Sequence, residues 1–180
     1  DRYDIWEVDP EGILKSIRIT PEGRKNQQKY RYIKLKKEER FIEKNQILLL
    51  HAFNELDKTE GIYYLKYSPG ARLNLLTSGP YQYRSIRQAQ EGKELIFTQA
   101  NFSTFPDIKS TRFFKKISAI SQANPQQNTY NWGTAELYNW TSLDGQLLEG
   151  LLIKPENFDP SKKYPMIVNF YEQSSDNLYR

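Results

Sequence analysis

Apolar and polar residues alternate over short stretches in most of this 180-residue chain. Such alternation is the pattern of a half-buried β-strand, because successive strand side chains point to opposite faces of a sheet. The stretches that predict strands are 3–9, 13–20, 29–35, 39–54, 61–68, 73–79, 81–89, 94–101 and 111–118. A strand and its turn together take roughly ten residues, a spacing that predicts an all-β sandwich, barrel or propeller.

Two regions carry more specific expectations. Residues 3–9 and 13–20 flank a Pro-Glu-Gly turn and are expected to form a hairpin. Residues 39–54 are expected to give a short strand and then a more apolar one. A helix is the alternative there, because apolar residues between Ile47 and Leu56 could share one helix face. The strand is favoured because 61–68 follows as the return of a hairpin.

The predicted strands fall into groups of about four, with a repeat of roughly 45 to 50 residues, the size of one β-propeller blade. This repeat is one of rhythm and not of residue identity. It favours a propeller over a sandwich without excluding the sandwich.

The pattern changes near residue 120. Residues 121–134 are polar, contain Pro125 and Gly133, and are typical of an inter-domain connector. The following stretch, 135–155, predicts a long hairpin. After a turn, the apolar run that ends at Tyr171 predicts the first core strand of an α/β domain.

Composition changes this picture little. Aromatic residues make up 14% of the chain, which favours strands and argues against disorder. The net charge is +4, and the densest basic cluster is Lys34, Lys36, Lys37 and Arg40, among Glu38 and Glu39. Such a mixed cluster is typical of a solvated face, so we expect no nucleic-acid partner. No run reaches the ~18 apolar residues of a membrane span.

Few residues offer catalytic or metal chemistry. The chain has no cysteine, which excludes disulfides, thiolate metal sites and a cysteine nucleophile. Its one histidine, His51, lies in an apolar run and is interpreted as a packed or hydrogen-bonded core residue. The G-x-S-x-G, phosphate-loop and calcium-loop patterns are missing, so we expect no cofactor and no metal. The carboxylates that qualify by type alone, and that we interpret as turn or solvent residues, are Asp107, Asp144, Glu149 and Glu156.

The stretch from Asn131 to Tyr171 resembles the start of the α/β-hydrolase domain in the prolyl oligopeptidase family of serine peptidases. The matching positions are Trp140, Thr141 or Ser142, Asp144, Gly145, Leu148, Gly150, Leu152, Pro155, Phe158, Asp159, Pro160, Lys162, Lys163, Tyr164 and Pro165. Upstream, residues 97–111 and 124–134 look like the last propeller blades and the inter-domain junction of bacterial members related to dipeptidyl peptidase IV.

The resemblance implies a fold, a function and a location. In this family a β-propeller caps a hydrolase domain whose Ser, Asp and His hydrolyse peptides, often after proline. The chain would then be mainly β, with propeller blades of antiparallel four-stranded sheets in 1–120, a connector in 121–134, and the first hairpin and strand of the α/β-hydrolase in 135–180. It would be an inactive fragment, with the triad beyond Arg180. A peptide would be the substrate of the parent protein, and a bacterial periplasmic or extracytoplasmic location is implied.

One catalytic residue is implied inside the chain. The family's strand pattern YP-x-x-V-x-x-Y-G-G-P ends in a tyrosine whose hydroxyl stabilises the oxyanion of the tetrahedral intermediate. Tyr171 matches that tyrosine. Glu172 and Gln173 replace the two glycines, so the resemblance does not fix the turn that would aim the hydroxyl. The alternative is that Tyr171 is an ordinary strand aromatic.

Two other classes of protein remain open. The chain could be a complete all-β carbohydrate- or protein-binding module, whose exposed Tyr and Trp residues form the binding face, or a propeller that acts only as an interaction scaffold. Blades taken from a closed ring expose strand edges, so the fragment interpretation predicts self-association.

Overall fold

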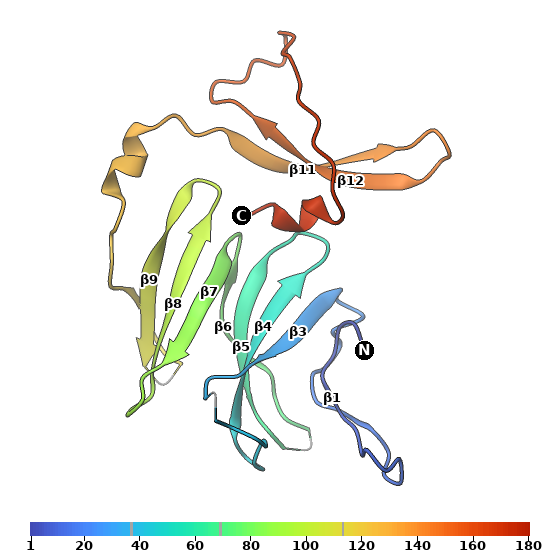
Figure 1. Cartoon of the computed structure of the whole chain (residues 1–180), viewed down its shortest axis with the longest axis vertical. Helices are drawn as coiled ribbons and strands as arrows, with labels where there is room; N and C mark the ends of the chain where they lie inside the picture. Colours follow the sequence, from blue (N-terminus) through green and yellow to red (C-terminus); the bar gives the residue numbers. More distant parts are fainter. Residues whose placement is uncertain (37, 69, 113) are drawn as a thin grey trace.

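The computed structural model describes residues 1–36, 38–68, 70–112 and 114–180, which form an almost entirely β structure with antiparallel pairing (Figure 1). The strands are β1 Trp6–Glu7, β2 Ile17–Arg18, β3 Gln28–Ile33, β4 Ile47–Asn54, β5 Glu60–Lys66, β6 Asn74–Gly79, β7 Gln82–Gln88, β8 Glu94–Asn101, β9 Thr104–Arg112, β10 Ile117–Ala119, β11 Thr134–Thr141 and β12 Leu147–Lys154. Two four-stranded sheets have the orders β3–β4–β5–β6 and β10–β9–β8–β7, and β1–β2 and β11–β12 form two-stranded ribbons.

The N-terminal hairpin is present but shorter than predicted. Only two residue pairs join β1 to β2, with Trp6 opposite Arg18. The amide of Ile19 donates to the carbonyl of Ile5 at 2.8 Å, and the amide of Tyr30 in β3 donates to the carbonyl of Tyr3 at 2.8 Å. The N-terminal segment therefore lies along the edge of the first sheet.

The first sheet is buried on both faces, which explains the continuous apolar run in β4. Leu48, Leu50 and Ala52 face one core together with Tyr30, and the N-terminal segment covers this side. Leu49 points the opposite way, because strand side chains alternate between faces. A strand covered on both sides needs apolar residues at consecutive positions.

A second core joins the two sheets. Leu49 and Ile62 of the first sheet pack with residues of the second, and the rings of Tyr83 and Phe97 lie 6.0 Å apart. Leu95 completes the cluster. Burying one such side chain is worth about 1.5–3 kcal/mol, so this core holds the two sheets face to face.

The C-terminal third begins with the short 3₁₀ helix η1 Pro125–Thr129 and continues into the β11–β12 hairpin at the top of Figure 1. The hairpin pairs along its full length, from Thr134 opposite Lys154 to Thr141 opposite Leu147. Its turn uses Gly145 at φ 83, a left-handed conformation that glycine adopts without strain. The predicted hairpin at 135–155 is confirmed.

Two predictions upstream of the hairpin are wrong. Residues 39–42 form no strand, and β4 begins only at Ile47, after a turn with Asn45 at φ 69. The helical alternative is wrong as well, since 47–54 is a strand.

The strand predicted at 111–118 is also misplaced. Its residues, of which Phe113 lies outside the described ones, are divided between the end of β9 and β10. The strand β9 was not predicted, and it contains Pro106, which cannot donate to a strand ladder. The sheet accommodates Pro106 because the β8–β9 register shifts between Gln99 and Asn101, and because β10 pairs only with residues 109–111 of β9.

The predicted core strand ending at Tyr171 is not a strand in the structure. Residues 164–171 are extended but pair with no neighbouring strand among the described residues. Their side chains face solvent, with Ile167 97% and Phe170 89% exposed. The segment leads into the 3₁₀ helix η2 Ser174–Asn177, beyond which Leu178 is buried. A strand needs a hydrogen-bonding partner, and the described part of the chain offers none here.

Candidate functional site

Tyr171, the residue predicted to stabilise an oxyanion, lies at the end of the exposed extended segment. Its side chain is largely exposed, and its backbone carbonyl accepts a hydrogen bond from the Ser174 hydroxyl at 3.1 Å. Gln173 occupies the second of the two positions at which the family pattern has glycine, and its φ of 54 is left-handed. The backbone therefore takes a glycine-like turn here without a glycine.

The four carboxylates chosen by type do not converge. Asp107 accepts hydrogen bonds from the Ser121 hydroxyl at 2.6 Å and from the Ala123 amide at 2.8 Å, and these bonds lower its pKa. Asp144 is bound within the hairpin turn, and Glu156 is exposed in the turn after β12. These environments are those of turn and surface residues, as the sequence predicted. Glu149 is the exception, because it pairs with a buried lysine.

The described residues offer no further metal or membrane feature. They contain no group of three or more His, Asp or Glu side chains able to hold a metal ion. Within the same ranges, no helix has the length and apolar composition needed to cross a bilayer.

His51 belongs to a charged cluster between the two sheets. Its Nε2 lies 2.9 Å from an oxygen of Glu60, which begins β5 and is buried. Arg84 of β7 donates from Nη1 to Glu60 Oε2 at 2.5 Å and from Nη2 to Oε1 at 2.7 Å. The amide of Tyr83 adds a bond of 3.0 Å to Oε2. The hydrogen-bonded histidine predicted from sequence is confirmed, and its partner is a carboxylate.

The pKa of Glu60 reflects this surrounding. Burial alone raises the pKa of Glu60, but the hydrogen bonds from His51, Arg84 and the Tyr83 amide outweigh it and hold the pKa at about 2. Glu60 is thus ionised at neutral pH. The cluster joins the two sheets, because Glu60 and His51 belong to the first and Arg84 and Tyr83 to the second.

A second charged cluster joins the first sheet to the hairpin. Lys58, in the turn between β4 and β5, is only 6% exposed. Its Nζ lies 2.7 Å from Glu149 Oε1 of β12 and 3.4 Å from Asp176 Oδ1 of η2, and it donates to the carbonyl of Glu55 at 2.8 Å. Figure 1 shows η2 above this turn. Lys58 therefore connects three segments that are far apart in the sequence.

Glu55 extends this cluster toward the N-terminus. Lys29 Nζ lies 2.5 Å from Glu55 Oε1, the Tyr3 hydroxyl donates to Oε2 at 2.6 Å, and Arg2 pairs with the same carboxylate. Burial raises the pKa of Glu55, and these three partners outweigh it to give about 2. The Lys58 and Glu55 clusters together contain three carboxylates and three cations. The carboxylates are Glu55, Glu149 and Asp176, and the cations are Arg2, Lys29 and Lys58. Partly buried charges require such pairing.

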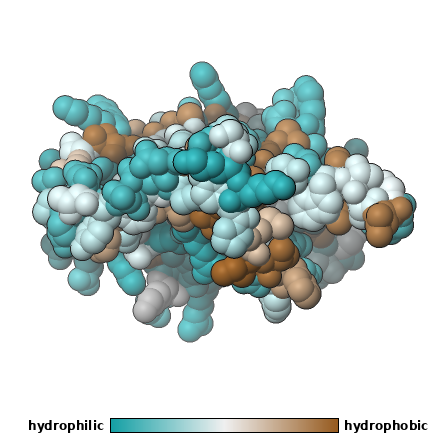
Figure 2. Space-filling view, turned by 90° about the horizontal axis from the view of Figure 1, so that it is seen from above, coloured by the Kyte–Doolittle hydropathy of each residue, from teal (hydrophilic) through white to brown (hydrophobic). Residues whose placement is uncertain are grey.

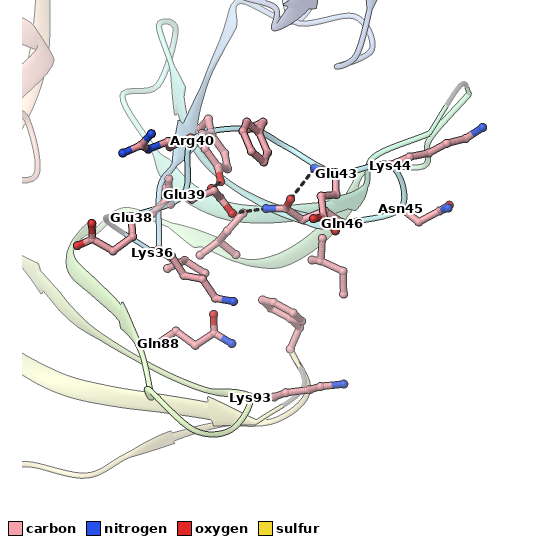
Figure 3. A pocket seen from close by; sticks show the side chains of 17 residues that line it. Lys36, Glu38, Glu39, Arg40, Glu43, Lys44, Asn45, Gln46, Gln88 and Lys93 are labelled. Atoms are coloured by element: carbon pink, nitrogen blue, oxygen red, sulfur yellow. Dashed lines mark hydrogen bonds between the residues drawn. The ribbon is translucent and has the colours of Figure 1, made fainter.

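A cavity lies between the two sheets and the segment before β4 (Figure 3). Its volume is about 800 Å³, and residues of both sheets line it. Leu49, Ile47 and Phe114 supply apolar surface, and the loop supplies a rim of charged side chains. Among that rim are Lys36 and Arg40, from the basic cluster interpreted in the sequence as a solvated face. Lys37 of the same cluster lies outside the described residues.

Sequence reasoning missed both the Glu60 cluster and the cavity. Only a weak indication of the Glu60 cluster is present in the sequence. Glu60 is a single charged residue just before the apolar residues of β5, at a position that faces the second sheet. The cavity had no signal, because its walls come from separate strands and a loop.

Comparison with known proteins assigns no relationship. No protein-family model matches the chain, and no curated protein is significantly similar to it.

Proposed function

We propose that this chain is part of a prolyl oligopeptidase-type serine peptidase. In this proposal the sheets β3–β6 and β7–β10 are consecutive propeller blades, and β11–β12 is the first hairpin of the α/β-hydrolase domain. Residues 121–134 form the inter-domain connector. The whole protein hydrolyses peptides, and the chain described here supplies no nucleophile of its own.

One observation carries the proposal. Two consecutive four-stranded antiparallel meanders pack through apolar faces, and the chain then runs through a polar connector into a fully paired hairpin. Sequential four-stranded meanders packed face to face are the repeating unit of a propeller. The hairpin and its following turn carry the residues of the family resemblance from Trp140 to Pro165.

Tyr171 is the catalytic residue assigned by the proposal. Its hydroxyl is exposed here, and in the whole enzyme it would donate to the oxygen on which negative charge develops. Gln173, at the second glycine position of the family pattern, has a left-handed backbone that glycine adopts without strain, which is compatible with this assignment.

The first test is the sequence of the natural polypeptide. The proposal predicts that it contains, beyond the residues described here, a G-x-S-x-G turn followed by an Asp and then a His. A polypeptide without these elements would contradict the peptidase function. In addition, the 180-residue chain is expected to leave a Gly-Pro-p-nitroanilide substrate uncleaved, and cleavage blocked by a serine-directed inhibitor would overturn the fragment interpretation.

The second test addresses Tyr171 in the whole polypeptide. Removing one oxyanion donor costs on the order of 10²–10³ in kcat, so Tyr171→Phe is expected to lower kcat by that order and to change KM little. Tyr130→Phe, an exposed tyrosine of the connector, is the matched control and should keep full activity. Equal kcat values in the two variants would remove Tyr171 from the mechanism.

A binding module is the second candidate, and one observation favours it. The rings of Tyr138 and Trp140 stack on the outer face of β11, with centroids 6.3 Å apart and planes 23° from parallel. Flat exposed aromatic pairs bind sugar rings or apolar side chains. Titration of the chain with oligosaccharides, followed by tryptophan fluorescence, should show saturation that Trp140→Ala removes. A monomer that melts cooperatively would also favour this candidate.

A further inference from the structure

The cavity beside β4 has no role in the proposed peptidase function. It lies at the end of the sheets opposite the β11–β12 hairpin (Figure 1). Its volume of about 800 Å³ is in the range of sites that hold small molecules or a few residues of a peptide. Its lining includes residues of both sheets.

The apolar wall of the cavity is fixed by packing between the sheets. Leu49 is 1% exposed, and the ring of Phe114 stacks on Tyr64 of β5 at 4.7 Å and 17°. Phe114 has a φ of 55, a left-handed conformation that costs a residue with a side chain of order 1–3 kcal/mol. The fold thus maintains a strained residue that presents an aromatic ring to the cavity.

The opposite wall carries the carboxylate of Glu39, which already has hydrogen-bond donors within the protein. The hydroxyl of Tyr32 donates to Glu39 Oε2, and Gln46 Nε2 donates to Glu39 Oε1 at 2.5 Å. Gln46 in turn accepts the amide of Glu43 at 2.9 Å. Both oxygens of Glu39 are therefore occupied within this wall.

Lys36 brings a positive charge to the cavity, whose lining also includes Glu43, Lys44 and Lys93. The Lys36 side chain points across the cavity toward Gln88 of β7, whereas Glu38 and Arg40 point away from it (Figure 3). Within the described ranges, no carboxylate pairs with the Lys36 ammonium group. The amide nitrogen of Gln88 donates one hydrogen bond to the Gly92 carbonyl at 3.2 Å, which leaves its second N–H for a ligand.

We propose that this cavity binds an apolar carboxylate, either a free acid or the carboxyl end of a peptide whose last residue is apolar. Lys36 pairs with the carboxylate, Gln88 donates a hydrogen bond to it, and the apolar body packs on Phe114 and Leu49. One ammonium group and one amide N–H suit a carboxylate, whose two oxygens can each accept one of these donors.

Calorimetric titration of the 180-residue chain tests the proposal. The probes are 3-phenylpropionate, its neutral amide 3-phenylpropanamide, and N-acetyl-Ala-Phe. The two acids are expected to bind saturably, and the propionate at least about fivefold more tightly than its amide, because only the acid gains a charge-assisted hydrogen bond. Among these outcomes, equal affinities of the propionate and the peptide would identify the free acid as sufficient, whereas tighter binding of the peptide would identify a peptide end as the preferred ligand.

The control variant lies two residues away. Lys34 is exposed on the same segment but does not line the cavity. Lys36→Gln is expected to abolish the preference for acid over amide, and Lys34→Gln to preserve it. Equal loss in both variants, equal affinity of acid and amide for the unaltered chain, or no saturable binding would each overturn the proposal. The acid-to-amide comparison needs no variant, so a folding defect in Lys36→Gln leaves the test intact.

Discussion

Arg84 and Glu60 form a two-pronged ion pair that joins the first strand of the second sheet to the third strand of the first. The two N–H···O distances are 2.5 and 2.7 Å. The guanidinium is half exposed while the carboxylate is 7% exposed, so the pair lies at the rim of the core between the sheets. A fork of this kind fixes direction as well as distance. It therefore adds a directional contact to the apolar packing between the two sheets.

Replacing Glu60 with glutamine is expected to destabilise the chain by about 2–4 kcal/mol, because three donors lose a charged acceptor and the Tyr83 amide is buried. Urea unfolding at neutral pH measures the change. Glu22→Gln, which breaks an exposed pair with Lys25, is the control and should change stability by less than about 1 kcal/mol. Equal effects of the two substitutions would show that the inter-sheet pair contributes no more than a surface pair.

Acid should weaken the same contact. The pKa of Glu60 is about 2 in the folded chain and 4.5 in an ordinary environment. A depressed pKa contributes stability that is fully present above pH 4.5 and is lost as the pH falls toward 2, and its size here is about 3 kcal/mol. The stability difference between the unaltered chain and Glu60→Gln should therefore shrink over this interval. A difference that stays constant from pH 6 to pH 2 would contradict the assignment.

Lys58 is expected to control how firmly the hairpin is held to the first sheet. Lys58→Met removes the cation shared by Glu149 and Asp176, whose side chains are about one third exposed and can be resolvated. We therefore expect a loss of about 1–2 kcal/mol, together with faster amide hydrogen exchange in β12 and η2. Lys25→Met, at an exposed lysine, is the control. Unchanged exchange in β12 would show that apolar contacts alone hold the hairpin.

Strands were predictable from the sequence where the local pattern of apolar and polar residues shows which side chains are buried. Strands were predicted correctly from the alternation in 29–35 and 94–101 and from the apolar run of β4. In each stretch the apolar residues are the ones that the sheet buries. The long hairpin was equally clear. By contrast, the pairing of Glu60 with Arg84 depends on how two sheets face each other, and no local pattern encodes it.

The wrong predictions have the same physical origin. No strand was predicted over 104–110, yet β9 forms there, with Pro106 where the ladder is already interrupted. The apolar run that ends at Tyr171 argued for a strand, yet a strand exists only with a partner, and the described residues provide none. Lys36 is exposed, as expected of a solvated face, but its place in the lining of a cavity with Gln88 and Phe114 depends on contacts between separate segments that no local pattern encodes.

The exposed segment 164–171 predicts self-association of the chain. Figure 2 views the face that carries the hairpin and the C-terminal segment, where apolar side chains lie among polar ones. An extended apolar segment without a partner pairs with another molecule. Sedimentation velocity should therefore show larger species as concentration rises, and the double substitution Ile167→Lys with Phe170→Lys should remove them. Leu143→Lys, at the exposed hairpin tip, is the control and should leave association unchanged. A chain that stays monomeric at every concentration would contradict the prediction.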